Sequence, residues 1–175
     1  MKRVLLIFVG GAMLIADSII WPAVSGRIGG FGIILFLIGL ILTFGMHRWV
    51  VGWGLGISFV AELLLGLYFG SLMGTWLIIC WAWYLASRFL SMKPLQETDS
   101  WFGIIPLALC GIALYVIAEI GEWLLVRRAY ENNLPSTLLK SLLTNPAMFA
   151  GMSIELILLL LVLRSVYAPK FSIYA

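Results

Sequence analysis

The sequence FGIILFLIGLILTFGM at residues 31–46 is followed, after a short polar break, by VVGWGLGISFVAELLLGLYF at residues 50–69. A helix needs roughly 17 to 25 apolar residues to cross the hydrocarbon core of a bilayer, and both stretches come close to that length. The break between them is little more than His47-Arg48-Trp49, so the two stretches are expected to form a tight antiparallel hairpin. This hairpin predicts an all-α integral membrane protein.

Four more apolar runs flank the hairpin, at residues 4–20, 72–90, 102–126 and 147–167. The chain is 63% hydrophobic and 11% charged, whereas a soluble domain carries about 25% charged residues. No polar segment is long enough to separate two domains. We therefore expect six transmembrane helices in one polytopic domain over residues 1–175. Asp17, Trp21 and Pro22 make a poor cleavage site, so the first run is expected to stay as a span.

The basic residues predict the orientation. With the N-terminus in the cytoplasm, seven of the 11 basic residues fall inside and four outside, the direction that the positive-inside rule requires. The inner residues are Lys2, Arg3, Arg48, Arg88, Lys93, Arg164 and Lys170, and the outer ones are Arg27, Arg127, Arg128 and Lys140. Six spans then place both termini in the cytoplasm.

The connection between the last two runs is the longest, over residues 127–146. Within it, residues 136–144 carry a leucine stripe with Lys140 on the opposite face, between Pro135 and Asn145-Pro146. This spacing predicts a short amphipathic helix on the outer surface.

Acidic residues inside the apolar runs are the first candidate functional residues. A carboxylate at the bilayer centre costs on the order of 3 kcal/mol on insertion scales, so such residues usually face the bundle interior. Glu62 lies near the middle of the third run, Glu119 toward the outer end of the fifth, and Glu155 about two turns into the last. We expect Glu62 and Glu155 to be paired, protonated or in contact with water.

A second polar group is expected at the outer end of the fifth run. Glu122 follows Glu119 by three residues and shares its helix face, and Arg127 and Arg128 come soon after. Asp17 is expected to lie at the membrane interface. Two interpretations of the acidic residues stay open: a polar cavity or a proton or cation path, and a set of interhelical hydrogen bonds that fix packing.

Gly66, Gly70 and Gly74 recur every four residues at the exit of the third run. Small residues at that spacing allow helix backbones to approach closely in lipid, so they are candidates for packing within the bundle or between subunits.

Several function classes receive no support from the sequence. It contains no H-E-x-x-H, G-x-S-x-G or P-loop motif, so we expect neither an enzyme nor a cofactor. His47 is the only histidine and has no cysteine or histidine close to it in sequence, which argues against a metal site. The net charge of +3 is scattered, which argues against nucleic-acid binding.

Three features in order along the chain form a pattern. They are the short opening span that ends at Asp17–Pro22; the glycine-rich third span with Glu62 and its exit Gly66–Gly74; and Leu134–Leu138 through Asn145-Pro146, leading to a last span that ends in Arg164. This pattern resembles the bacterial rod shape-determining MreD family. In that family the position of Glu62 is commonly aspartate.

The resemblance implies a six-helix bundle similar to the S components of energy-coupling-factor transporters. It also implies a non-enzymatic scaffold or regulatory subunit of the cell-wall elongation complex in the bacterial cytoplasmic membrane. The implied partners are membrane lipid, an MreC-like protein and the peptidoglycan synthases. The alternatives are a substrate-binding S component of a vitamin transporter, with Glu119, Glu122, Arg127 and Arg128 near its pocket, or a small proton-coupled transporter that uses Glu62 and Glu155.

Overall fold

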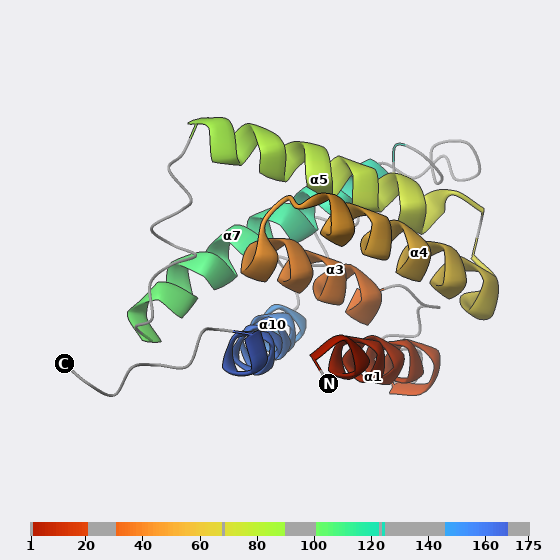
Figure 1. Cartoon of the computed structure of the whole chain (residues 1–175), viewed down its shortest axis with the longest axis horizontal. Coiled ribbons are helices and arrows are strands. Elements are labelled where there is room, and N and C mark those ends of the chain that lie inside the picture. The colour runs from red at the N-terminus through yellow and green to blue at the C-terminus, as the bar shows by residue number, and fades with distance from the viewer. Residues whose placement is uncertain are drawn as a thin grey trace.

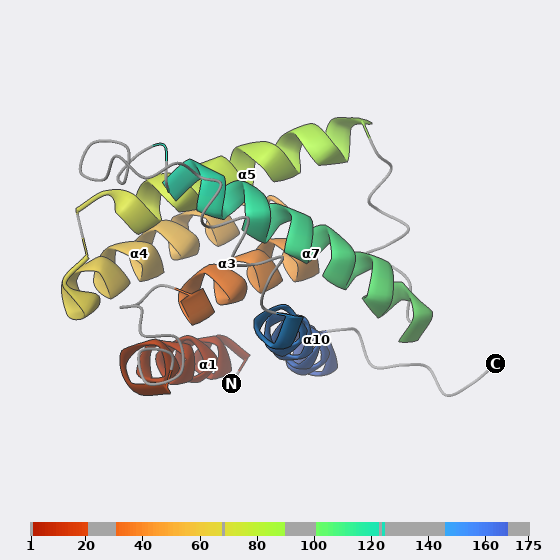
Figure 2. The same ribbon diagram turned by 180° about the vertical axis from the view of Figure 1, so that it is seen from behind.

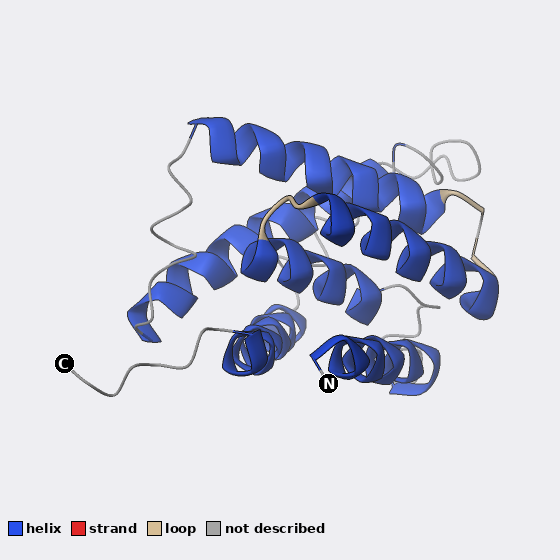
Figure 3. Cartoon of the chain, viewed as in Figure 1, coloured by secondary structure: helices blue, strands red, loops and turns tan. Residues whose placement is uncertain are grey.

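The computed structural model describes residues 2–20, 31–67, 69–89, 101–122, 124 and 146–167. Over these ranges the chain consists of helices and short turns, which confirms the all-α expectation for this part of the chain (Figure 3). The elements are α1 (Lys2–Ile15), the π-helical segment η1 (Ala16–Ile20), α3 (Phe31–Phe44), α4 (Arg48–Leu65), α5 (Ser71–Phe89), α7 (Trp101–Glu122) and α10 (Pro146–Tyr167). The amphipathic helix expected at 136–144 lies outside the described residues.

Helix α3 is the centre of the bundle. Its sequence is apolar on every side, which is the pattern of a helix surrounded by others. Every residue from 32 to 42 is buried, and α3 contacts α1, η1, α4, α5, α7 and α10. In Figures 1 and 2, α1 and α10 lie on one side of α3, and α4, α5 and α7 on the other.

From α1 to α5, helices that follow one another in the chain alternate in direction. Helices α1 and α4 run one way through the bundle, whereas α3 and α5 run the other way (Figures 1 and 2). The α3–α4 turn contains Gly45 with a φ of 71°, in the left-handed region that glycine adopts without strain. The end of α1 therefore lies near the start of α3, and the end of α4 near the start of α5.

Two described helices are long and apolar enough to cross a membrane: α4 over Arg48–Leu65, and the Ile104–Gly121 part of α7. The stretches Leu6–Ile19 and Gly32–Phe44 are apolar but shorter. With 14 residues, α3 is about 21 Å long, against a hydrocarbon core of about 30 Å. That all six helices cross a bilayer therefore remains a proposal.

Close contacts between helices occur at glycines other than those singled out in the sequence. A Cβ atom at Gly54 of α4 would overlap the indole ring of Trp76 on α5. A Cβ atom at Gly39 or Gly111 would likewise press against a leucine of α10. The Trp76 ring is fully buried, and its Nε1–H donates a 3.1 Å hydrogen bond to the carbonyl of Val51. These contacts determine how closely α5 and α10 pack against their neighbours.

Candidate functional site

Glu62 caps the helix that follows it in the chain. Its side chain is only 2% exposed. Its Oε2 accepts a hydrogen bond from the backbone N–H of Gly70, and its Oε1 accepts one from that of Met73, both at 2.8 Å. Gly70 directly precedes α5 and Met73 is the third residue of α5. Because the first N–H groups of a helix have no partner within it, this carboxylate replaces a capping side chain.

The expected position of Glu62 in the middle of a span is wrong, because the residue lies in the last turn of α4. Its carbonyl accepts the N–H of Gly66, and also that of Leu67 at 3.1 Å. The same residue therefore ends α4 with its backbone and starts α5 with its side chain. The expectation that it faces the protein interior agrees with its burial.

Gly66 and Gly70 do not pack one helix against another, which corrects the interpretation of their spacing. Both lie in the turn between α4 and α5, with φ values of 63° and 87°, and a Cβ atom at either would meet no neighbour within 4 Å. Their positive φ angles allow the turn to fold back over Glu62. Gly74 lies in the first turn of α5, where its N–H donates to the Gly70 carbonyl.

Asp17 forms the same arrangement one hairpin earlier. Asp17 lies in η1 and is fully buried among the helices; its expected position at the membrane interface stays a prediction. Its Oδ1 accepts the N–H of Gly32 at 2.6 Å and its Oδ2 accepts that of Ile33 at 2.8 Å. These are the second and third residues of α3. Each of the two carboxylates therefore binds the positive end of another helix dipole.

The remaining acidic candidates have smaller roles in the geometry. Glu119 is partly buried and accepts a hydrogen bond from the Tyr115 hydroxyl one turn earlier on α7. Glu155 of α10 is partly buried, and the negative charge of Asp17 acts on it. The side chain of Glu122 is outside the described part of the chain, as are Arg127 and Arg128.

The arrangement favours a structural role for the two buried carboxylates. All four of their oxygens accept backbone hydrogen bonds from N–H groups at the starts of α3 and α5, and these bonds hold the two helix starts in place. Charge-assisted hydrogen bonds of this kind contribute about 1.5–3 kcal/mol each. Among the described residues, no three histidine, cysteine, aspartate or glutamate side chains gather where they could hold a metal ion.

The sequence contained a signal for these caps that the periodicity of apolar residues did not reveal. The residues before α3 and α5 are Gly30 and Gly70, so neither helix has serine, threonine, aspartate or asparagine at the usual capping position. An acidic residue inside the preceding apolar run is then a candidate cap from elsewhere in the chain. Asp17 and Glu62 both satisfy that description.

Comparisons with known proteins provide no relative from which the function of this site could be inferred. No protein-family model, no curated protein and no solved structure matches this chain.

Proposed function

We propose that this chain is a non-enzymatic scaffold or regulatory subunit of the bacterial cell-wall elongation complex, held in the cytoplasmic membrane by six helices. The observation that carries the scaffold class is that Asp17 and Glu62 are occupied in capping other helices. Buried groups used in this way support a rigid bundle that acts through its surface. The assignment to the elongation complex rests on the MreD-like order of sequence features.

The exposed surface supports the membrane location. Large apolar side chains from four helices are between 61% and 81% exposed: Phe8, Leu64, Trp81, Phe89 and Leu109. Soluble monomers rarely expose contiguous apolar patches above a few hundred Å². Lipid acyl chains would cover these side chains at no cost. Exposed apolar residues on α1, α4, α5 and α7 are therefore consistent with a bundle surrounded by lipid.

The proposed topology has both termini in the cytoplasm and residues 127–146 outside. A cysteine at Asn133, in a chain with Cys80 and Cys110 replaced by alanine, tests it. An impermeant maleimide is expected to label that cysteine in intact cells. Labelling only after lysis would place this segment inside and overturn the topology.

Affinity capture of the full chain from mild detergent, together with depletion in cells, tests the function. The proposal expects co-purification with a single-span coiled-coil protein and with peptidoglycan synthases, and rounding of depleted rods. Normal cell shape after depletion, with none of these partners captured, would overturn it.

The position of Glu155 favours a second candidate, a vitamin-binding S component or a small proton-coupled transporter. Glu155 is a partly buried acid on which the negative charge of Asp17 acts. Capture of two ATPases together with a bound vitamin would support the S component. Proton-coupled uptake that is lost in Glu155→Gln would support the transporter.

A further inference from the structure

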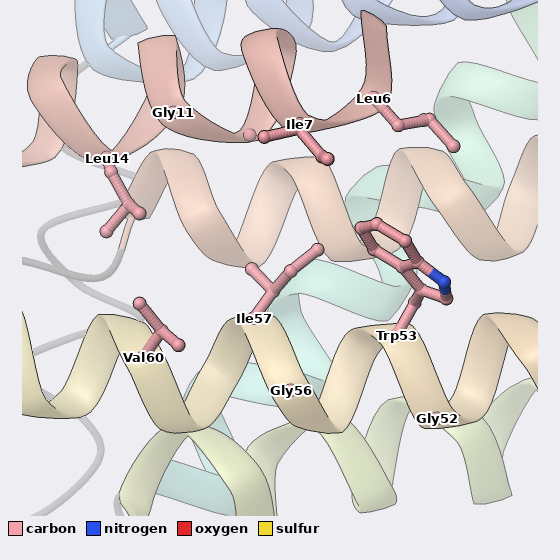
Figure 4. A pocket seen from close by; sticks show the side chains of 10 residues that line it. Leu6, Ile7, Gly11, Leu14, Gly52, Trp53, Gly56, Ile57 and Val60 are labelled. Carbon is pink, nitrogen blue, oxygen red and sulfur yellow. The ribbon is translucent and has the colours of Figure 1, made fainter. Parts of the chain in front are cut away.

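An apolar groove runs between α1 and α4, two helices that lie side by side on α3 (Figure 4). Its volume is about 500 Å³, within the range of roughly 300–1,000 Å³ of small-ligand pockets. Leu6 and Trp53 lie at one end, and Leu14 and Val60 at the other (Figure 4). Both walls contain glycine: Gly10 and Gly11 on α1, and Gly52 and Gly56 on α4. The shape is a long apolar channel that is open along its side.

The glycines give the groove its depth. A Cβ atom at Gly11, Gly52 or Gly56 would meet no other atom within 4 Å. These glycines therefore face empty space, in contrast to Gly54 on the α5 side of the same helix, which lies against Trp76. In a bilayer this space must hold something apolar, because the lining offers almost no polar group.

Both helices that form the groove begin with basic residues, and this end of the groove is called the basic end. Helices α1 and α4 run in the same direction (Figure 1), and each begins a few residues before the residue that marks this end of the groove, Leu6 on α1 and Trp53 on α4. Lys2 and Arg3 begin the sequence of α1, and the exposed Arg48 begins α4, about 6 Å along the axis from Gly52. Neither helix has an acidic residue in its first turn, and His47 makes no side-chain cap to α4. Two positive helix-dipole ends therefore add to the basic residues.

We propose that the α1–α4 groove binds an anionic phospholipid, with an acyl chain along the groove and the phosphate at the basic end. Charge complementarity selects this occupant over a neutral lipid. This site rests on the membrane location proposed above but not on the assignment to the elongation complex.

Native mass spectrometry of the full chain in detergent with phosphatidylglycerol or phosphatidylcholine tests the proposal. Each basic residue near an anionic headgroup contributes about a fivefold gain in affinity. We expect a one-lipid adduct in which phosphatidylglycerol is preferred by about fivefold or more. Equal retention of the two lipids would overturn the proposal.

Two variants locate the lipid. Gly56→Leu adds an apolar side chain to the groove, where its Cβ atom meets no neighbour within 4 Å, and is expected to lower the phosphatidylglycerol adduct at least fivefold. Gly151→Leu on α10 is the control, because a Cβ atom at Gly151 also meets no neighbour within 4 Å. Arg48→Gln is expected to lower the preference for phosphatidylglycerol about fivefold, whereas Arg88→Gln, an exposed change on α5, leaves it unchanged.

Three results contradict the assignment. An unchanged adduct in Gly56→Leu would place the lipid elsewhere, and an equal effect of Arg48→Gln and Arg88→Gln would show only a general attraction to charge. A dimer that is lost in Gly56→Leu, with no lipid adduct in the wild type, would identify the groove as an interface between copies of the chain.

Discussion

The helices that start at the two ends of α4 differ in whether an acidic side chain caps them. At the capped end, where α1 and α4 finish, Asp17 and Glu62 bind the first N–H groups of α3 and α5. At the basic end, where α1 and α4 begin, the first turns carry no acid. The chain thus supplies its own anions at one end and leaves the other end to anions from its surroundings.

Burial explains the difference. Gly32 and Ile33 at the start of α3 are buried, so water cannot satisfy their N–H groups. Arg48 and Trp49 at the start of α4 are exposed, so water or lipid headgroups can reach that turn. A buried helix start requires a partner within the fold, whereas an exposed one is free to bind an external ligand.

The largest expected effect is at the capped end. Glu62→Leu leaves two backbone donors without their acceptor and should lower the free energy of unfolding by about 4 kcal/mol. Glu62→Gln retains one acceptor oxygen, so its loss should be about half as large. Thermal or denaturant unfolding in detergent measures both. Wild-type stability of Glu62→Leu would show that the cap contributes nothing.

Removal of the charge alone from the second cap, Asp17, should lower the stability somewhat less than Glu62→Leu does. Asp17→Asn keeps an acceptor for Gly32 or Ile33 but loses the charge that interacts with the α3 dipole, at an expected cost of about 2 kcal/mol. The same unfolding assay applies, with Glu119→Gln as a control at a partly buried acid that contacts a tyrosine hydroxyl. If the control is destabilised as much as Asp17→Asn, the loss is not specific to helix capping.

Gly54 and Gly56 provide a matched pair that separates packed from open surface on α4. Gly54→Ala forces a methyl group into Trp76 and should cost about 1.5 kcal/mol. Gly56→Ala adds a methyl group in open space, so its better helix propensity should stabilise the protein by about 0.5–1 kcal/mol. Effects of the same sign in the two variants would contradict the assigned faces of α4.

A small effect is also expected when an acidic side chain is introduced at the basic end. His47 has the extended backbone of an N-cap, with φ −90° and ψ 149°, so His47→Asp should stabilise α4 by about 1 kcal/mol in neutral detergent. His47→Asn should cap the helix similarly without adding charge. Only the aspartate variant is expected to weaken phosphatidylglycerol binding. A loss of lipid in both variants would assign the effect to helix capping and not to charge.

Candidate residues were only partly predictable from the sequence. The high cost of burying a lone carboxylate indicated that Glu62 faces the interior, and it does. The sequence did not reveal that Asp17 is fully buried, because its partners are backbone groups 15 and 16 residues away. The spacing of Gly66 and Gly70 predicted helix packing, but their φ values place them in a turn.

The sequence by itself determined the helical class. A helix such as α3 that is apolar on all sides can be satisfied by burial or by lipid, and the tertiary structure decided for burial at the centre of the bundle. Only the tertiary structure decided which carboxylate caps which helix, and which glycines face a neighbour or open space. These outcomes depend on contacts between residues far apart in the chain. Local periodicity records which face of a helix is apolar, but not which helix or ligand lies against that face.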